Sequence, residues 1–163
     1  MIRFVLALAL LSAAPVLAQE TASSTMQTTD AEPDPMTALD RWRAAPTTVF
    51  DAAEISLDDF MWEARPIVVF ADSPNDPNFR RQMQLIENRP EDLAERDVLV
   101  VTDTDPSAES DIRQRLRPRG FMLALIGKDG QVKLRKPLPW DVRELSRSID
   151  KMPLRQQEID DRR

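Results

Sequence analysis

The sequence predicts one α/β domain in which a mixed β-sheet lies between two layers of helices. Three observations support this fold class. Three short apolar runs are typical of strands buried on both faces. Helical patterns that begin at an Asp-Pro pair follow the first two runs. An Asp-Gly turn joins the third run to a strand of alternating pattern, as in a β-hairpin.

The first half of the predicted domain contains two strand–helix units. Residues 67–71 are continuously apolar and form the first strand, and a helix begins at Asp76. The second unit repeats this order, with a strand over residues 98–101 and a helix that begins at Asp105. A proline follows each aspartate at the first helical position, where its missing N–H costs nothing. The first helix turns one apolar stripe toward the core, formed by Phe79, Met83 and Ile86.

The second half contains a hairpin and a last helix. Residues 121–126 form the third strand, the turn lies at Asp129 and Gly130, and residues 132–135 return with alternating polarity, as expected at a sheet edge. Two parallel units followed by such a hairpin predict a three-layer sandwich with strand order 4-3-1-2. A ferredoxin-like order is the less favoured alternative because the hairpin turn is short. The last helix ends at Pro153, and its apolar stripe is Val142, Leu145, Ile149 and Met152.

Residues 1–18 have the pattern of an export signal. Arg3 is their only charged residue, an apolar run covers residues 4–11, and small residues end at Ala18, where a signal peptidase cleaves. The apolar run is shorter than the roughly 20 residues of a membrane-spanning helix. We therefore expect cleavage near Ala18 and a protein that is periplasmic or secreted, with no membrane span.

The remaining boundaries follow from composition. Residues 19–54 are rich in polar residues and proline, and they predict a disordered tether. Within this tether, Leu39 and Trp42 could begin a short helix, which Pro46 would end. Residues 55–154 are predicted to form the folded domain, and residues 155–163 a polar tail that frays.

The composition excludes several kinds of chemistry. The chain has no cysteine and no histidine, so it carries no thiol for disulfide exchange or peroxide reduction. A zinc or copper site would have only oxygen ligands, which these metals do not favour, and we expect no cofactor and no metal. The net charge of −6 argues against nucleic-acid binding, which needs an excess of cations.

Four segments resemble one family of bacterial exported proteins and animal sushi-repeat matrix proteins, a thioredoxin-like domain of unknown function. The most specific of them contain GKDG and MPLRQQE; the segments are WEARPIVVFA (62–71), LAERDVLVV (93–101), GFMLALIGKDGQVKLR (120–135) and IDKMPLRQQEI (149–159). The resemblance implies a thioredoxin-like fold with a distant relation to peroxiredoxins. Redox-active relatives carry Cys-x-x-Cys after the first strand, where this chain has residues 72–76, and a cis-proline where it has Met122. Both parts of a redox site are therefore missing.

The candidate site comes from the uneven distribution of charge. Residues 112–136 contain eight basic side chains and one acid. Because strands three and four meet at the end where relatives carry their cysteines, we predict an anion or partner site there. Arg117, Arg119 and Arg135 would act as bidentate donors, and Lys133 and Lys136 would add positive field. The alternative is that these cations pair with the acids of the chain itself.

The sequence predicts a non-catalytic binding or accessory module whose partner is an acidic protein or an anionic ligand. Two other classes remain open. One is an enzyme without thiol chemistry, either a carboxylate-based hydrolase or a degenerate peroxiredoxin relative. The other is a purely structural protein of the cell envelope.

Overall fold

A computed structural model describes residues 36–163. The predicted signal peptide and residues 19–35 of the predicted tether lie outside the described residues. Five strands form one sheet in the order β1-β3-β2-β4-β5. β1, β3 and β2 are parallel, β4 is antiparallel to β2, and β5 is antiparallel to β4. The strands are β1 (Val49–Asp51), β2 (Arg65–Phe70), β3 (Val98–Asp103), β4 (Met122–Ile126) and β5 (Val132–Lys136).

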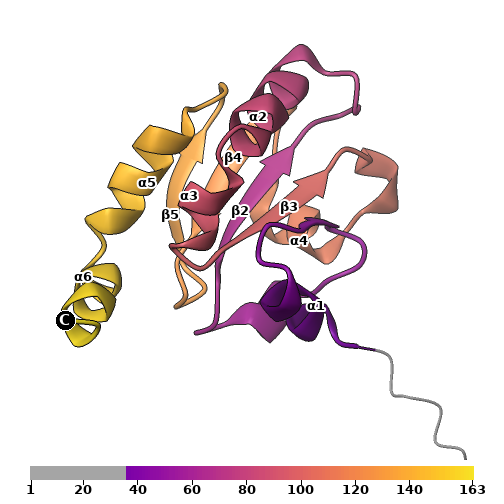
Figure 1. Ribbon diagram of the computed structural model, residues 1–163. Coiled ribbons are helices and arrows are strands. Elements are labelled where there is room, and N and C mark those ends of the chain that lie inside the picture. The colour runs from indigo at the N-terminus through magenta and orange to yellow at the C-terminus, as the bar shows by residue number, and fades with distance from the viewer. Residues whose placement is uncertain (1–35) are drawn as a thin grey trace, which may run out of the picture. The chain divides into compact units, whose positions relative to one another are not determined.

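Helices cover both faces of the sheet (Figure 1). One core contains side chains from α2, α3 and α5, and the other contains side chains from α1, α4 and a 3-10 turn at Leu57–Phe60. The α-helices are α1 (Ala38–Ala44), α2 (Pro77–Glu87), α3 (Pro90–Ala94), α4 (Asp111–Leu116), α5 (Val142–Asp150) and α6 (Pro153–Asp161). Among the described residues, no helix is long and apolar enough to cross a membrane.

The α/β class is confirmed, and the strand order differs from the predicted one in one detail. The four predicted strands lie in the predicted order, because β5-β4-β2-β3 corresponds to 4-3-1-2. The fifth strand, β1, pairs in parallel with β3 and extends the sheet beyond it. The hairpin places β5 at the opposite edge, as its alternating pattern predicted.

The prediction of disorder up to residue 54 is wrong for the segment that forms α1 and β1. Trp42 and Phe50 are buried in the core, and their rings meet Phe60 edge-on at centroid distances of 6.3 Å. The indole N–H of Trp42 also donates to the carbonyl of Val98 at 3.4 Å. The few apolar residues of this segment are typical of a tether. They are nevertheless sufficient to order it, because both rings cover a face of the sheet.

Two helical segments also differ from the prediction. Asp105 caps only a 3-10 turn, and α4 begins later, where the hydroxyl of Ser110 accepts from the N–H of Arg113 at 3.0 Å. Most of the predicted polar tail belongs to α6, which begins at Pro153 and buries Arg155. An apolar stripe is absent from α6, so periodicity could not reveal it; ion pairs hold it instead.

Candidate functional site

The turn after β2, where redox-active relatives carry cysteines, is occupied by polar contacts of the chain itself. The carboxylate of Asp76 accepts from the N–H groups of Asn78 at 2.7 Å and Phe79 at 3.1 Å. The carboxylate of Asp72 lies 3.7 Å from the guanidinium of Arg113. Because Asp76 already caps α2, the N-terminus of this helix does not offer free amides to a ligand.

Beside this turn, four of the five predicted cations line one groove of about 270 Å³. It lies where β4 begins and β5 ends, since Leu123 pairs with Lys136 across the two strands. We call it the cationic groove; its residues are Arg117, Arg119, Phe121, Met122, Arg135, Lys136 and Pro137. The fifth predicted cation, Lys133, is not part of it.

The cations of the groove are held without acidic partners. Arg135 donates to the carbonyl of Leu116 at 2.7 Å, which fixes its guanidinium at the end of α4. The ammonium of Lys136 lies 4.2 Å from the ring centroid of Trp140. Arg117 and Arg119 are exposed. Within residues 36–163, none of these four cations forms an ion pair, so the groove remains positively charged.

Lys133 belongs to a second pocket, at the hairpin end of the sheet. Its ammonium pairs with Asp129 at 2.6 Å, and its side chain lies over the backbone of Gly127. A Cβ at Gly127 would stand 2.6 Å from the Lys133 Cε and 2.5 Å from an Asp129 carboxylate oxygen, so a larger residue here would displace the ends of both side chains. The pocket encloses about 310 Å³. We call it the Trp62 pocket; its lining is Trp62, Arg65, Gly127, Lys128, Asp129, Lys133, Met152, Pro153 and Leu154.

Buried ion pairs lie behind the Trp62 pocket. The side chain of Arg65 is only 1% exposed, and its guanidinium donates to the carboxylate of Glu158 at 2.7 Å. The ammonium of Lys128 lies 3.0 Å from the same carboxylate and 2.9 Å from that of Asp97. These contacts join the start of β2, the hairpin and α6, three segments that are distant in sequence.

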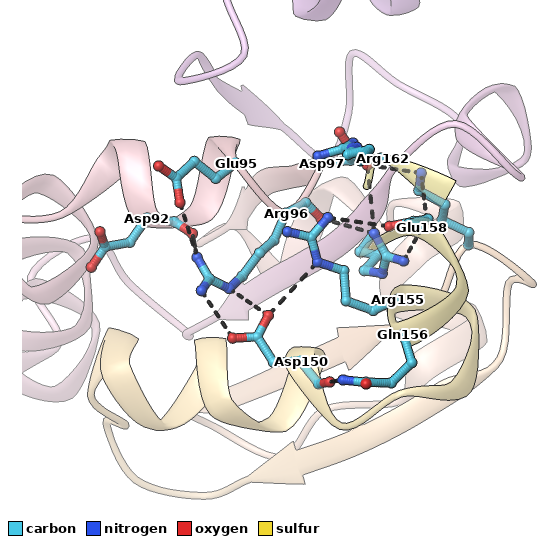
Figure 2. A network of polar contacts seen from close by, with 11 residues as sticks. Asp92, Glu95, Arg96, Asp97, Asp150, Arg155, Gln156, Glu158 and Arg162 are labelled. Carbon is cyan, nitrogen blue, oxygen red and sulfur yellow. Dashed lines mark hydrogen bonds and ion pairs between the residues drawn. The ribbon is translucent and has the colours of Figure 1, made fainter. Parts of the chain in front are cut away.

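The network continues along α6 toward α5 and the segment after α3 (Figure 2). Arg96 binds both carboxylate oxygens of Asp150 at 2.9 Å, in the bidentate geometry that arginine favours. Arg155 lies between Asp150 and Glu158, at 3.7 Å and 3.3 Å. Its Nε atom is buried and has no hydrogen-bond partner. The guanidinium of Arg155 is therefore held by one hydrogen bond to Glu158 and by the charge of Asp150.

Two carboxylates of this region, those of Glu158 and Asp129, have a lowered pKa. Burial by itself raises the pKa of Glu158, but hydrogen bonds from Arg65 and Lys128, together with their charges, outweigh it and lower the pKa to about 2. The hydrogen bond from Lys133 lowers the pKa of Asp129. Both groups are therefore charged at neutral pH.

Sequence reasoning missed the Trp62 pocket. Trp62 belongs to no regular pattern in the sequence, yet its side chain is exposed and its backbone is left-handed, with φ +68°. A signal was nevertheless present, because GKDG supplies three residues of the pocket and MPLRQQE supplies its other wall together with Arg155 and Glu158. Neither segment shows an amphipathic pattern that would explain these residues as core.

Comparison with known families and structures agrees with this fold. The family described as "Domain of unknown function (DUF4174)" matches residues 56–158, more than half of the chain. No curated protein matches the sequence significantly. The fold resembles a 2-Cys peroxiredoxin from Plasmodium vivax in its reduced form, with a TM-score of 0.52 and 12% identity over 63% of this chain and 85% of that one.

Two further peroxiredoxins are less similar. The mitochondrial 2-Cys enzyme of Plasmodium falciparum has a TM-score of 0.44 and 18% identity over 59% of this chain and 79% of that one. The yeast mitochondrial 1-Cys enzyme has a TM-score of 0.42 and 17% identity over 65% and 97%. The cysteines on which those names rest have no counterpart here, because this chain has none. The fold is thioredoxin-like and similar to that of the Plasmodium vivax peroxiredoxin, and by its sequence the chain belongs to the DUF4174 family.

Proposed function

We propose that this protein is an exported, non-catalytic binding module that holds an anionic ligand or an acidic protein segment in the cationic groove. The observation that carries the proposal is the convergence of Arg117, Arg119, Arg135 and Lys136 without an acidic partner among residues 36–163. The chain as a whole is acidic, with a net charge of −6, whereas this groove is positively charged.

The groove residues would contribute to binding in different ways. Arg117 and Arg119 present planar guanidinium groups that match carboxylate or phosphate with paired hydrogen bonds. Arg135 is positioned in advance by its bond to the carbonyl of Leu116. Phe121 and Met122 form the apolar floor from which the charges project, and partial exclusion of water there strengthens the attraction.

Charge reversal at Arg117 and Arg119 tests this proposal. Neither side chain makes an intramolecular hydrogen bond in the part of the chain that the structure describes, so the double variant R117E/R119E should melt close to the wild type. Arg135 is left unchanged because it supports the end of α4. The matched control is R81E/R143E, which changes the net charge equally at two other exposed arginines.

The probes are poly-L-glutamate and tripolyphosphate, titrated by calorimetry at low and high salt. We expect R117E/R119E to lose at least tenfold in affinity at low salt and less at high salt, because salt already screens the electrostatic attraction that the variant removes. R81E/R143E should lose much less. Equal affinity of the two double variants would place the site elsewhere. Export is tested separately by the intact mass of the mature chain, which should begin at Gln19 or close to it.

A further inference from the structure

The Trp62 pocket combines two features that are unfavourable for folding. Trp62 has φ +68°, in a region that residues other than glycine rarely adopt, and it is 64% exposed. Its N–H donates to the carbonyl of Lys128 at 2.7 Å, which ties this conformation to the hairpin. Such strain clusters at functional sites. Here it presents an indole ring to solvent rather than burying it.

The second unfavourable feature is the charge behind the pocket. Arg65 is almost completely buried at the start of a strand whose other residues are apolar. A buried ion pair is often no more stable than apolar residues of the same volume. The pairs from Arg65 and Lys128 to Glu158 instead fix where the hairpin and α6 lie, and thereby place both walls of the pocket. The pocket is therefore organised before any ligand enters.

The polar groups that line the pocket have unused donors. The ammonium of Lys128 has two carboxylate partners and that of Lys133 has one, whereas each ammonium carries three protons. The carboxylate of Asp129 already accepts from Lys133 and from the N–H of Gln131. These unused donors favour an acceptor at the polar end of a ligand, and a carboxylate matches two ammonium groups best.

The remaining walls are apolar. Trp62 forms one side, and Met152, Pro153 and Leu154 form the other. A flat ring between an indole and a methionine gains both stacking and sulfur–aromatic contact. The volume of about 310 Å³ is at the lower end of the range for small-molecule sites and suits one or two rings.

We propose that the Trp62 pocket binds a small aromatic carboxylic acid, with its ring between Trp62 and the 152–154 segment and its carboxylate on Lys133 and Lys128. This site is independent of the cationic groove. The two lie at opposite ends of the β4–β5 hairpin, because the groove contains Lys136 at the end of β5 and the pocket contains the hairpin turn.

The probe is 1-naphthylacetate, compared with 1-naphthalenemethanol, which has the same rings and no charge. In ¹⁵N-labelled protein, 1-naphthylacetate should shift the indole N–H signal of Trp62 and leave that of Trp42, which is buried, in place. The alcohol should bind at least tenfold more weakly by calorimetry. No shift of the Trp62 signal up to millimolar probe would overturn the proposal, and equal affinity for acid and alcohol would overturn the carboxylate assignment.

Variants separate this site from a merely structural role. Trp62→Gly should abolish binding without lowering the unfolding midpoint, because glycine accepts the positive φ. Trp62→Asn, which also tolerates this conformation, is the second variant if glycine loosens the turn. Leu138→Ala is the control, because Leu138 is equally exposed (64%) and lies outside the pocket.

Lys133→Gln should lower the affinity for 1-naphthylacetate at least tenfold and leave the affinity for the alcohol unchanged. The control is Lys151→Gln, which changes an exposed lysine outside the pocket. R117E/R119E should keep full affinity for 1-naphthylacetate. The proposal for the cationic groove and the proposal for the Trp62 pocket can therefore fail independently of each other. Binding that survives both Trp62 variants would overturn the proposal.

Discussion

The carboxylate of Glu158 on α6 accepts a hydrogen bond at 2.7 Å from the guanidinium of Arg65 at the start of β2, 93 residues earlier in the chain. Arg65 is the more deeply buried of the two partners: 1% of its side chain is exposed, against 18% of the Glu158 side chain. Only Arg155 is buried on α6, so this helix has no apolar face with which to dock. Its position depends on charge pairing, and the pairing also shapes the Trp62 pocket.

We expect Glu158→Gln to lower the free energy of unfolding by roughly 2–3 kcal/mol, because it removes the nearer carboxylate from the buried guanidinium of Arg65 and leaves only that of Asp97, at 3.7 Å. The loss should fall below the usual cost of breaking a buried pair, since the amide oxygen can still accept from Arg65. Glu144→Gln is the control: it breaks an exposed pair with Arg147, at 2.6 Å, and should cost less than about 1 kcal/mol. Urea denaturation measures both. Similar losses in the two variants would show that the Arg65–Glu158 pair is not important for stability.

The same pair should make stability depend on pH in the acid range. Because the pKa of Glu158 is lowered from 4.5 to about 2 in the folded protein, its contribution is fully present above pH 4.5 and is lost as the pH falls toward 2. Glu158→Gln has no such titration. The urea midpoints of wild type and variant should therefore converge as the pH is lowered from 5 to 2.5. A difference that stays constant over this range would mean that the charge of Glu158 does not provide the stabilisation.

Phe50→Ala should destabilise the protein by about 3–4 kcal/mol, as expected when a buried phenylalanine is truncated. Phe50 is 2% exposed, and its ring contacts Phe60 and lies 5.1 Å below the guanidinium of Arg41. Val49→Ala is the control on the same strand, because Val49 is 41% exposed. Thermal unfolding of both variants measures the difference. If both variants unfold alike, β1 does not contribute to the stability of the domain.

The sequence was sufficient for the features that depend on neighbouring residues. Continuous apolar runs identified β2, β3 and β4, because a strand buried on both faces has no polar position. Asp76 and Pro77 identified the start of α2, because capping involves only the next two or three residues. The Asp-Gly turn paired β4 with β5. Together these local signals were enough for the fold class and for four of the five strands.

The structure brings the predicted site residues together only where strand direction determines their position. Arg117, Arg119, Arg135 and Lys136 share one groove because β4 begins where β5 ends. Lys133 was assigned to the same site by charge alone. It stands three positions before Lys136 on β5, and its side chain instead lies over Gly127 and pairs with Asp129 at the other end of the hairpin.

Tertiary structure alone decided that α1 and β1 join the core and that α6 forms a wall of the Trp62 pocket. Trp42 and Phe50 stand among polar neighbours, and only the uncovered face of β3 and the 3-10 turn at Leu57–Phe60 makes their burial favourable. Arg65 and Glu158 each read as ordinary surface charges, because pairing across 93 residues leaves no periodic trace in the sequence. Helical and strand periodicity record which face is apolar. Ion pairs between distant segments depend on where folding brings the chain together, which a local pattern does not contain.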